Sequence, residues 1–182
     1  MLIEREEDFL AALATDLGKP RLEAWVTEIG FTINEINLTL KNLKRWTKPK
    51  RVSTPMFIKP GSGRVIREPL GTVLVIAPWN YPLQLALAPL IGALAAGNTV
   101  ALKPSEISSA TSNTIARLVP QYVDAEAVSI VEGGVSETQN LLQQKWDYIF
   151  YTGNGAVGRQ VMAAAAQHLT PVTPELGGKS PA

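Results

Sequence analysis

The sequence predicts an open, mostly parallel α/β sheet with helices on both faces, preceded by a helical region. From Thr72 onward, short apolar runs rich in β-branched residues alternate with helical segments. Continuous apolar runs are typical of strands buried on both faces of a parallel sheet, and regular strand–helix alternation indicates parallel α/β architecture. Hydrophobic residues make up 46% of the 182 residues and charged residues 18%, a composition that favours a packed core over disorder.

The N-terminal region is predicted to be helical. The first helix covers residues 4–17, places Phe9, Leu10, Leu13 and Leu17 on one face, and is ended by the segment 18–20, Gly-Lys-Pro. A second helix follows over residues 22–43. Its apolar side chains recur at three- and four-residue spacing and predict a packing seam: Leu22, Val26, Ile29, Ile33, Ile36, Leu40 and Leu43.

The run "KNLKRWTKPKRV" ends this helix with six basic residues. It fits a nucleic-acid patch or, more simply, positive charge that complements the helix C-terminus and continues into a solvated linker. We favour the second interpretation and expect no nucleic-acid partner, because no further basic groove follows. The Pro/Gly-rich segment 54–71, with a short strand at Arg64–Arg67, marks the boundary between a helical region and linker (residues 1–60) and an α/β domain (residues 61–182).

Five strands and four helices are expected in the α/β domain. The strands cover residues 72–78, 98–104, 127–134, 146–153 and 170–178, and the helices cover residues 83–97, 108–123, 136–145 and 154–169, with Ser108 or Ser109 as a candidate cap of the second of these helices. The segment 70–102 has no charged residue and is long enough to span a bilayer. Pro78, Pro82 and Pro89 interrupt it, however, so we assign it to a buried core and expect no membrane attachment.

The residue inventory excludes several kinds of chemistry. The chain has no cysteine and one histidine, His168, which rules out a disulfide scaffold, a thiolate metal site and a cysteine nucleophile within these residues. No metal site is expected. The net charge of +1 steers neither nucleic acid nor acidic partners. The N-terminal segment lacks the basic and apolar parts of a secretory signal, so a cytoplasmic location is expected.

Ligands of open α/β sheets bind beyond the carboxyl ends of the strands, so the segments that follow the strands are the candidate sites. After the first strand, "PWNYP" holds Asn80 in a rigid loop, where its amide could donate to an oxyanion or stabilise a turn. After the second strand, "KPSE" places Lys103 and Glu106 three residues apart. They could clasp the hydroxyls of a ribose, or the segment could be a helix cap built on Ser105.

Two further segments carry glycines. "YTGNGAVG", residues 151–158, follows the fourth strand and resembles a phosphate-binding turn, although its glycine pattern is weak by itself and unusual at this position. After the fifth strand, Glu175 precedes Gly177 and Gly178. A carboxylate partly withdrawn from water there could act as a general base, and the simpler interpretation is a surface Glu at a turn.

The order of these segments is more informative than any one of them. "PWNYP", "ALKPSE", "SIVEGG", "YTGNGAVG" and "ELGGKSP", in this order, resemble the aldehyde dehydrogenase superfamily over residues 65–182. The N-terminal segments "DLGKPRLEAWVTEIG" and "LKNLKRW" resemble its class 3 branch, so the resemblance covers nearly the whole chain. It implies a Rossmann-like NAD(P)-binding domain.

The resemblance also implies a reaction. Members of this family oxidise aldehydes to carboxylic acids through a cysteine thioester. Asn80 matches the residue that holds the oxyanion, and Glu175 matches the base that activates water. The matching cofactor positions are Ile76, Ala77, Pro78, Trp79, Lys103, Ser105, Glu106, Gly133, Gly153, Asn154, Gly155, Val157, Gly158, Leu176 and Gly177. Charge repulsion between Glu106 and a 2′-phosphate favours NAD, with NADP as the alternative.

The resemblance further implies that the chain is a fragment, because the family's cysteine lies in a catalytic domain beyond Ala182. The 182 residues alone are then expected to be inactive, and the full-length protein to be a homodimer. Two alternatives remain. A thioester-forming or acyl-phosphate-reducing relative would not need Glu175, and a truncated, non-catalytic dinucleotide-binding or assembly protein would not need the cysteine.

Overall fold

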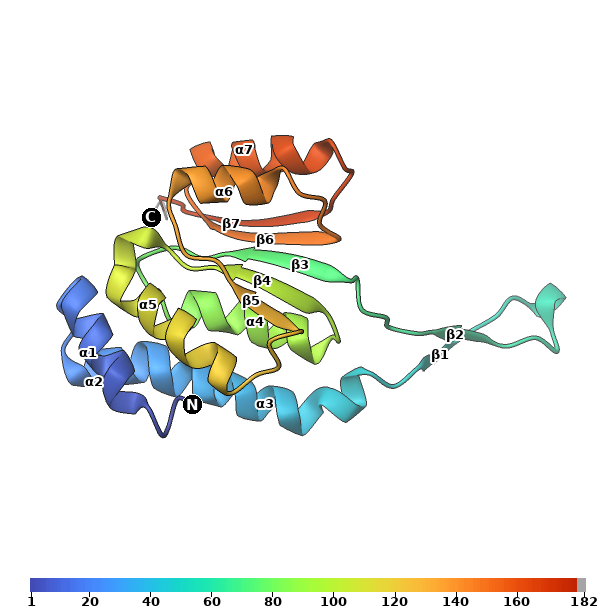
Figure 1. Cartoon of the computed structure of the whole chain (residues 1–182). Helices are drawn as coiled ribbons and strands as arrows, with labels where there is room; N and C mark the ends of the chain where they lie inside the picture. The colour runs from blue at the N-terminus through green and yellow to red at the C-terminus, as the bar shows by residue number, and fades with distance from the viewer. Residues whose placement is uncertain (180–182) are drawn as a thin grey trace.

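The computed structural model describes residues 1–179 and contains a five-stranded sheet with the order β5-β4-β3-β6-β7 (Figure 1). Every neighbouring pair in this sheet is parallel, which confirms the predicted fold class. The strands are β3 (Thr72–Ile76), β4 (Thr99–Lys103), β5 (Val128–Ile130), β6 (Tyr148–Gly153) and β7 (Val172–Leu176). The helices between them are α4 (Gln84–Ala95), α5 (Ser109–Leu118), α6 (Val135–Leu142) and α7 (Gly155–Ala166), with short 3₁₀ turns η3 (Glu106–Ser108) and η4 (Val119–Gln121) beside α5.

The register of the sheet brings the segments of interest to one edge. Ile76, at the end of β3, lies opposite Lys103 of β4 on one side and Tyr151 of β6 on the other. Thr152 of β6 lies opposite Glu175 of β7. Because parallel strands end on the same side, the loops that follow β3, β4, β6 and β7 are neighbours in space.

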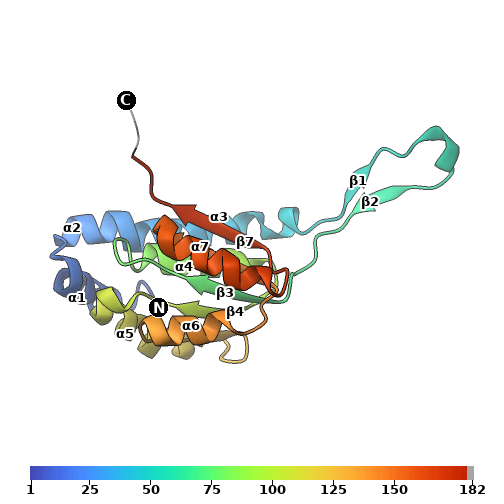
Figure 2. The same cartoon turned by 90° about the horizontal axis from the view of Figure 1, so that it is seen from above.

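Helices cover both faces of the sheet (Figures 1 and 2). Helices α4 and α5 lie on one face and α6 and α7 on the other. The larger core lies on the α4 and α5 side, where Val73, Val75 and Leu102 meet Leu83 and Leu118. A smaller core joins the opposite face to α7 and contains Leu74, Ile76, Ala101, Ile149, Tyr151, Val161 and Ala165.

The N-terminal helices form a further layer outside α4 and α5. Helix α1 (Glu6–Leu17) packs on α5, and α3 (Phe31–Trp46) packs on α4. Phe9 and Leu13 are fully buried in the larger core, as their shared face predicts. Gly18 ends α1 in the left-handed conformation, and its N–H donates to the carbonyl of Ala14 at 2.9 Å.

The predicted seam of the second helix is wrong in part. The helix is continuous but contains a π-helical turn, η1 (Trp25–Gly30), between α2 (Arg21–Ala24) and α3. Leu22, Val26 and Leu40 are exposed. Ile29 is fully buried as predicted, and Ile33 and Ile36 pack partly buried against the larger core. The buried face also carries Ala24, Glu28 and Thr32, which were not predicted and are each fully withdrawn from solvent. A π turn holds an extra residue per turn, which shifts the phase of the buried face and defeats a 3.6-residue periodicity argument.

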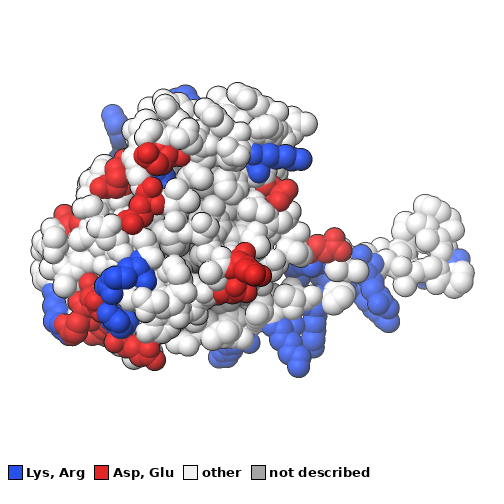
Figure 3. Space-filling model, viewed as in Figure 1, with Lys and Arg blue, Asp and Glu red and all other residues white. Residues whose placement is uncertain are grey.

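A two-stranded antiparallel hairpin projects from the body as an arm (Figures 1 and 2). It consists of β1 (Lys50–Val52), the 3₁₀ turn η2 (Met56–Ile58) and β2 (Gly63–Val65). The expected strand at Arg64–Arg67 therefore begins and ends earlier, and its partner β1 was not predicted because it lies within the basic run. Figure 3 shows basic side chains at the end of α3 and the base of this arm. Among the described residues, no helix combines the length and apolar character that a membrane crossing requires.

Candidate functional site

A cavity of about 1110 Å³ opens at the carboxyl ends of β3, β4, β6 and β7. Most of the residues selected from the sequence line it together: Ile76, Ala77, Pro78, Trp79, Asn80, Lys103, Ser105, Glu106, Gly153, Asn154, Val157, Glu175, Leu176 and Gly177. Gly133, between β5 and α6, and Gly155 and Gly158, in the first turn of α7, are not among the lining residues. Residues scattered over a hundred positions of sequence thus form one concave surface, as ligand sites of open α/β sheets do.

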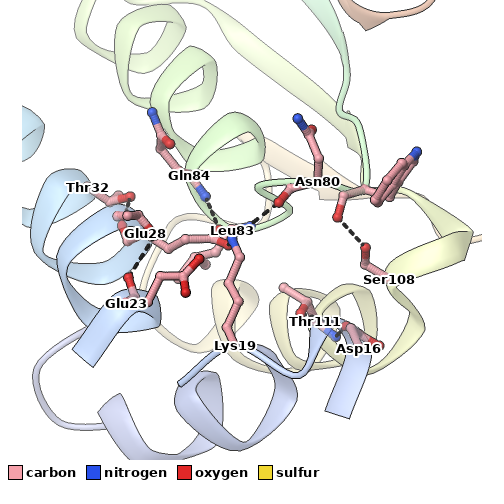
Figure 4. A network of polar contacts seen from close by, with 12 residues as sticks. Asp16, Lys19, Glu23, Glu28, Thr32, Asn80, Leu83, Gln84, Ser108 and Thr111 are labelled. Atoms are coloured by element: carbon pink, nitrogen blue, oxygen red, sulfur yellow. Dashed lines mark hydrogen bonds and ion pairs between the residues drawn. The ribbon is translucent and has the colours of Figure 1, made fainter. Parts of the chain in front are cut away.

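The loop that follows β3 presents Asn80. Its first residue, Ala77, is buried, and its N–H donates to the carbonyl of Lys103 at 3.0 Å. The Ser108 hydroxyl donates to the carbonyl of Trp79 at 2.8 Å (Figure 4). Ser108 was a candidate helix cap, and this bond shows a different role. The amides of Ala110 and Thr111 donate instead to the Asp16 carboxylate of α1.

Lys103 and Glu106 form an ion pair at the end of β4. Lys103 is 2% exposed, and its Nζ lies 3.0 Å from Glu106 Oε2 and 3.0 Å from the carbonyl of Pro104. Burial is the largest single influence on the pKa of Glu106 and raises it, but the Glu106 backbone N–H and Lys103 together lower it, so the net pKa lies below the ordinary value. Ser105 also caps the turn, since its hydroxyl accepts from the Ile107 N–H at 3.3 Å. The Lys103–Glu106 ion pair and the Ser105 cap therefore coexist in one turn.

The glycine turn after β6 is built over the buried ring of Tyr151. A Cβ at Gly153 would lie 2.3 Å from the Tyr151 hydroxyl, so only glycine fits there without a shift of the ring. The hydroxyl donates to the carbonyl of Asn154 at 3.1 Å. Burial is the largest influence on the pKa of Tyr151 and raises it, so the phenol remains neutral at physiological pH.

The same turn opens α7. The Asn154 side chain caps the helix by accepting from the Val157 N–H at 2.9 Å. Gly158 allows α7 to approach β7, because a Cβ there would lie 3.0 Å from Leu176 Cδ2. Gly155 has no such constraint, since the nearest atom to its Cβ would be Arg159 Nη1 at 3.7 Å. Two glycines of the motif, Gly153 and Gly158, therefore have steric reasons to be small, and Gly155 has none among the described residues.

Gly133 lies in the segment between β5 and α6. Its φ of +136° is disfavoured for other residues, and an added Cβ would lie 2.3 Å from Glu137 Cγ. Glu137 Oε2 accepts from the Gly134 N–H at 2.7 Å. Its hydrogen bonds with the Ser136 hydroxyl and with its own and the Gly134 backbone N–H lower the pKa of Glu137.

Glu175 lies at the end of β7, the edge strand of the sheet. It borders the cavity, but its side chain is exposed, whereas the sequence argument expected it to be partly withdrawn from water. The reason is its place at the outer end of an edge strand, where a neighbouring strand covers one side alone. Gly177 and Gly178 follow it with open space around both.

Sequence reasoning missed the contribution of α6. Val135, Thr138 and Gln139 line the same cavity as Lys103 and Glu106. Their three- and four-residue spacing puts them on one helix face, which was a usable signal. Sequence reasoning also missed Lys19 and Glu28, which contact the backbone of the loop that carries Asn80.

Comparison with known proteins places these features in context. The profile described as "Aldehyde dehydrogenase family" matches residues 1–182. The chain is 54% identical to aldehyde dehydrogenase family 3 member H1 of Arabidopsis thaliana, over 97% of this chain and 36% of that protein. It is 51% identical to 4,4′-diaponeurosporen-aldehyde dehydrogenase of Staphylococcus aureus, over 97% of this chain and 38% of that protein. The chain thus spans little more than a third of the length of these relatives.

Solved structures agree with this result. The substrate-bound structure of Staphylococcus aureus AldH superimposes with a TM-score of 0.97 and 49% identity, over 99% of this chain and 39% of that one. A Mycobacterium tuberculosis aldehyde dehydrogenase complexed with NAD+ superimposes with a TM-score of 0.88 and 34% identity, over 99% of this chain and 37% of that one. The sheet order, the cavity at its carboxyl edge and these matches lead to one conclusion: the chain belongs to the aldehyde dehydrogenase family.

Proposed function

We propose that this chain is the cofactor-binding portion of an enzyme that oxidises an aldehyde to a carboxylic acid with a nicotinamide dinucleotide. The observation that carries the proposal is the single cavity that joins Asn80 and Glu175 to the Lys103–Glu106 pair. Asn80 supplies an amide donor, Glu175 supplies a carboxylate, and Lys103 with Glu106 supplies a charged pair suited to hydroxyl groups. A cysteine nucleophile is absent from these 182 residues, so the reaction requires a further segment.

The residues present fit a dinucleotide. The cavity is large, and a charged pair at the end of β4 offers an ammonium donor and a carboxylate acceptor to the two hydroxyls of a ribose. The turn at Gly153 and the N-terminus of α7 offer small residues and helix-end amides to a diphosphate. Such a cofactor supplies the two-electron oxidant, and the chain's residues bind and orient it.

Glu106 supports a preference for NAD over NADP. Its lowered pKa keeps it ionised at neutral pH, and its side chain is 46% exposed and therefore accessible to a ligand. A carboxylate accepts hydrogen bonds from a 2′-hydroxyl and repels a 2′-phosphate. Lys103 offsets part of this repulsion, so the preference is moderate rather than absolute.

Asn80 and Glu175 have separate tasks in the proposed reaction. Attack of a thiolate on the aldehyde carbonyl places negative charge on its oxygen, and the Asn80 amide donates a hydrogen bond to that oxygen. After oxidation the acyl group is a thioester. Glu175 takes a proton from water as the water attacks this thioester, which releases the acid and restores the thiolate.

The arm supports the further proposal that the full-length protein is a homodimer. Met56 and Phe57 at its tip are 81% and 86% exposed. Apolar side chains on a projecting hairpin are typical of a surface that another subunit covers. The oligomeric state in solution tests this directly, and a Phe57→Asp variant is expected to shift it towards monomer.

Dinucleotide titration of the chain tests the cofactor proposal. We expect calorimetry to detect NAD binding and weaker NADP binding, and Glu106→Gln to narrow the difference between them. Glu126→Gln, an exposed carboxylate that does not line this cavity, is the matched control. Failure of both dinucleotides to bind would contradict the proposal.

The reaction is tested in a protein that carries this chain together with a cysteine-containing segment. Asn80→Ala is expected to lower kcat about 10²- to 10³-fold, the usual effect of removing an oxyanion donor. Glu175→Gln is expected to allow one burst of cofactor reduction and then to stop, because the thioester is no longer hydrolysed. Dinucleotide binding without any aldehyde oxidation in that longer protein would favour the non-catalytic alternative.

A further inference from the structure

The buried carboxylate of Glu28 lies outside the cavity and has no role in the proposed reaction. Its side chain is fully buried, and every oxygen is paired. Oε1 accepts from Lys19 Nζ, and Oε2 accepts from the N–H groups of Leu83 at 2.9 Å and Gln84 at 3.1 Å. A buried carboxylate is costly unless it is fully paired, and here three donors from two distant segments pair it.

The partners of Glu28 belong to the segment that carries Asn80. Leu83 is the N-cap residue of α4 and Gln84 is its first residue, and the unpaired N–H groups at this helix end favour a negative charge. Glu28 thus caps α4 from a different part of the chain. The distance in sequence is 55 residues to Leu83, so this contact holds the N-terminal helices against the Asn80 loop.

Lys19 holds the same loop at its other end. Its side chain is 9% exposed, and its Nζ donates to the backbone carbonyl of Asn80 at 3.2 Å as well as to Glu28. The ammonium also lies 3.9 Å from the centre of the Tyr81 ring, a cation–π contact. A lysine has three N–H donors, and every contact described here directs them at Glu28 or the loop.

Figure 4 shows how this arrangement orients Asn80. The backbone carbonyl of Asn80 faces Lys19, and its side-chain amide points away from Lys19. Ser108 holds the preceding carbonyl, that of Trp79, from the side of α5. The peptide groups on both sides of the Asn80 Cα are therefore anchored, which sets the direction in which its side chain leaves the backbone, and Asn80 lines the cavity.

The π-helical turn η1 is a second, independent observation. Glu28 lies within it, and the Thr32 hydroxyl donates to the Glu28 carbonyl at 2.7 Å. Turns of this kind are rare and occur frequently at functional sites, because they redirect a side chain at a cost in helix stability.

We infer that Lys19 and Glu28 are positioning residues that set the direction of the Asn80 side-chain amide. The inference rests on the proposed function for what that amide does. An oxyanion donor is effective when it is held in place before the reaction, and a displacement of about 1 Å can cost about 10²-fold in rate. The pair acts through the backbone of residues 80–84 and touches neither the aldehyde nor the cofactor.

The kinetic test uses Lys19→Met in the longer protein that contains a cysteine segment. This variant keeps the length of the side chain and removes its donors. We expect kcat to fall about 10- to 100-fold, with the Kd for NAD unchanged within about twofold, because the residues that bind the cofactor are not altered. Lys19→Arg restores a donor to both Glu28 and Asn80 and is expected to recover most of kcat.

The control is Glu7→Gln. Glu7 forms an ion pair with Arg21 in the same N-terminal region, but both side chains are exposed. Figure 3 shows acidic and basic side chains side by side over α1 and α2, where this pair lies. Glu7→Gln removes one charge from an ion pair, and we expect it to leave kcat unchanged. If kcat of Glu7→Gln falls as far as kcat of Lys19→Met, the inference is overturned.

An NMR measurement on the chain separates this inference from the proposed function. The side-chain amide of Asn80 and the backbone amides of Leu83 and Gln84 are expected to shift in Lys19→Met and in Glu28→Gln, and to stay in place in Glu7→Gln. If the Asn80 resonances do not move, the pair has a structural role only and the inference is wrong. If they move but the longer protein oxidises no aldehyde in its native form, the positioning is supported and the proposed reaction fails.

Discussion

Gly153 and Gly155 are two residues apart in one motif, and the structure predicts opposite results for replacing each by alanine. At Gly153 the new Cβ would lie 2.3 Å from the Tyr151 hydroxyl and 2.7 Å from Cζ, about 1 Å closer than the 3.4 Å at which ordinary contact begins. The ring cannot swing away freely, because it is 4% exposed within the smaller core. The backbone or the ring must therefore shift.

The size of the effect follows from these contacts. Overpacking a core costs about 1–3 kcal/mol, and loss of the Tyr151–Asn154 hydrogen bond costs about 1 kcal/mol more. For a chain of this length, each kcal/mol lowers the melting temperature by roughly 2–4 °C. We therefore expect Gly153→Ala to lower it by roughly 4–16 °C. Gly155→Ala introduces only an ordinary contact at 3.7 Å and favours the helix, so its expected change is zero or a gain of up to about 1 kcal/mol.

Thermal unfolding followed by circular dichroism checks both variants, with NAD titration on the folded protein. Equal stability of Gly153→Ala and the native chain would refute the steric argument. Equal loss in both variants would show that the motif needs glycine for a general reason, such as backbone freedom, rather than for the ring beneath Gly153. If Gly155→Ala binds NAD more weakly but is as stable as the native chain, Gly155 is needed because the cofactor approaches its backbone closely.

Three further results are expected. Phe9→Ala should lower the free energy of unfolding by about 3–5 kcal/mol in urea because Phe9 is fully buried, whereas Phe57→Ala at the 86% exposed arm tip should change it by less than about 0.5 kcal/mol. Asp16→Ala should cost about 1–2 kcal/mol in the same assay, since its carboxylate accepts from the first amides of α5. The folded pKa of Glu106 is lower than its ordinary 4.5, so its ionised form stabilises the fold above that value and this contribution is lost as pH falls through the folded pKa. Urea titrations between pH 3 and 7 should therefore show the native chain exceeding Glu106→Gln in stability near neutrality and converging with it in acid, and a constant difference would contradict the lowered pKa.

Much of the fold and the candidate site could be predicted from the sequence because the signals are local. The strands of the parallel sheet are continuous apolar runs, and the loops after them carry the polar residues. The rule that ligands bind at the carboxyl ends then joins Asn80, Lys103, Glu106 and Glu175 without any coordinates. Gly18 ends α1 and Ser105 caps η3, as local patterns predict.

The remaining features depend on contacts between distant segments, which no periodicity reveals. Glu28 looks like an ordinary charged residue on a helix, and only the packing of η1 on α4 shows that it is fully buried against Leu83 and Gln84. Ser108 looks like a cap, but the Asp16 carboxylate of α1 occupies that role and leaves the hydroxyl for Trp79.

The sequence by itself therefore determined the sheet, the order of the loops and the residue types at the site. The tertiary structure decided which way those residues face, because orientation is set by pairing of buried charges and by steric contact. Two cases are clearest. Lys19 and Glu28 pair beside the Asn80 loop, and the Tyr151 ring lies beneath Gly153. Both depend on energies of desolvation and overlap that arise only when the chain is folded.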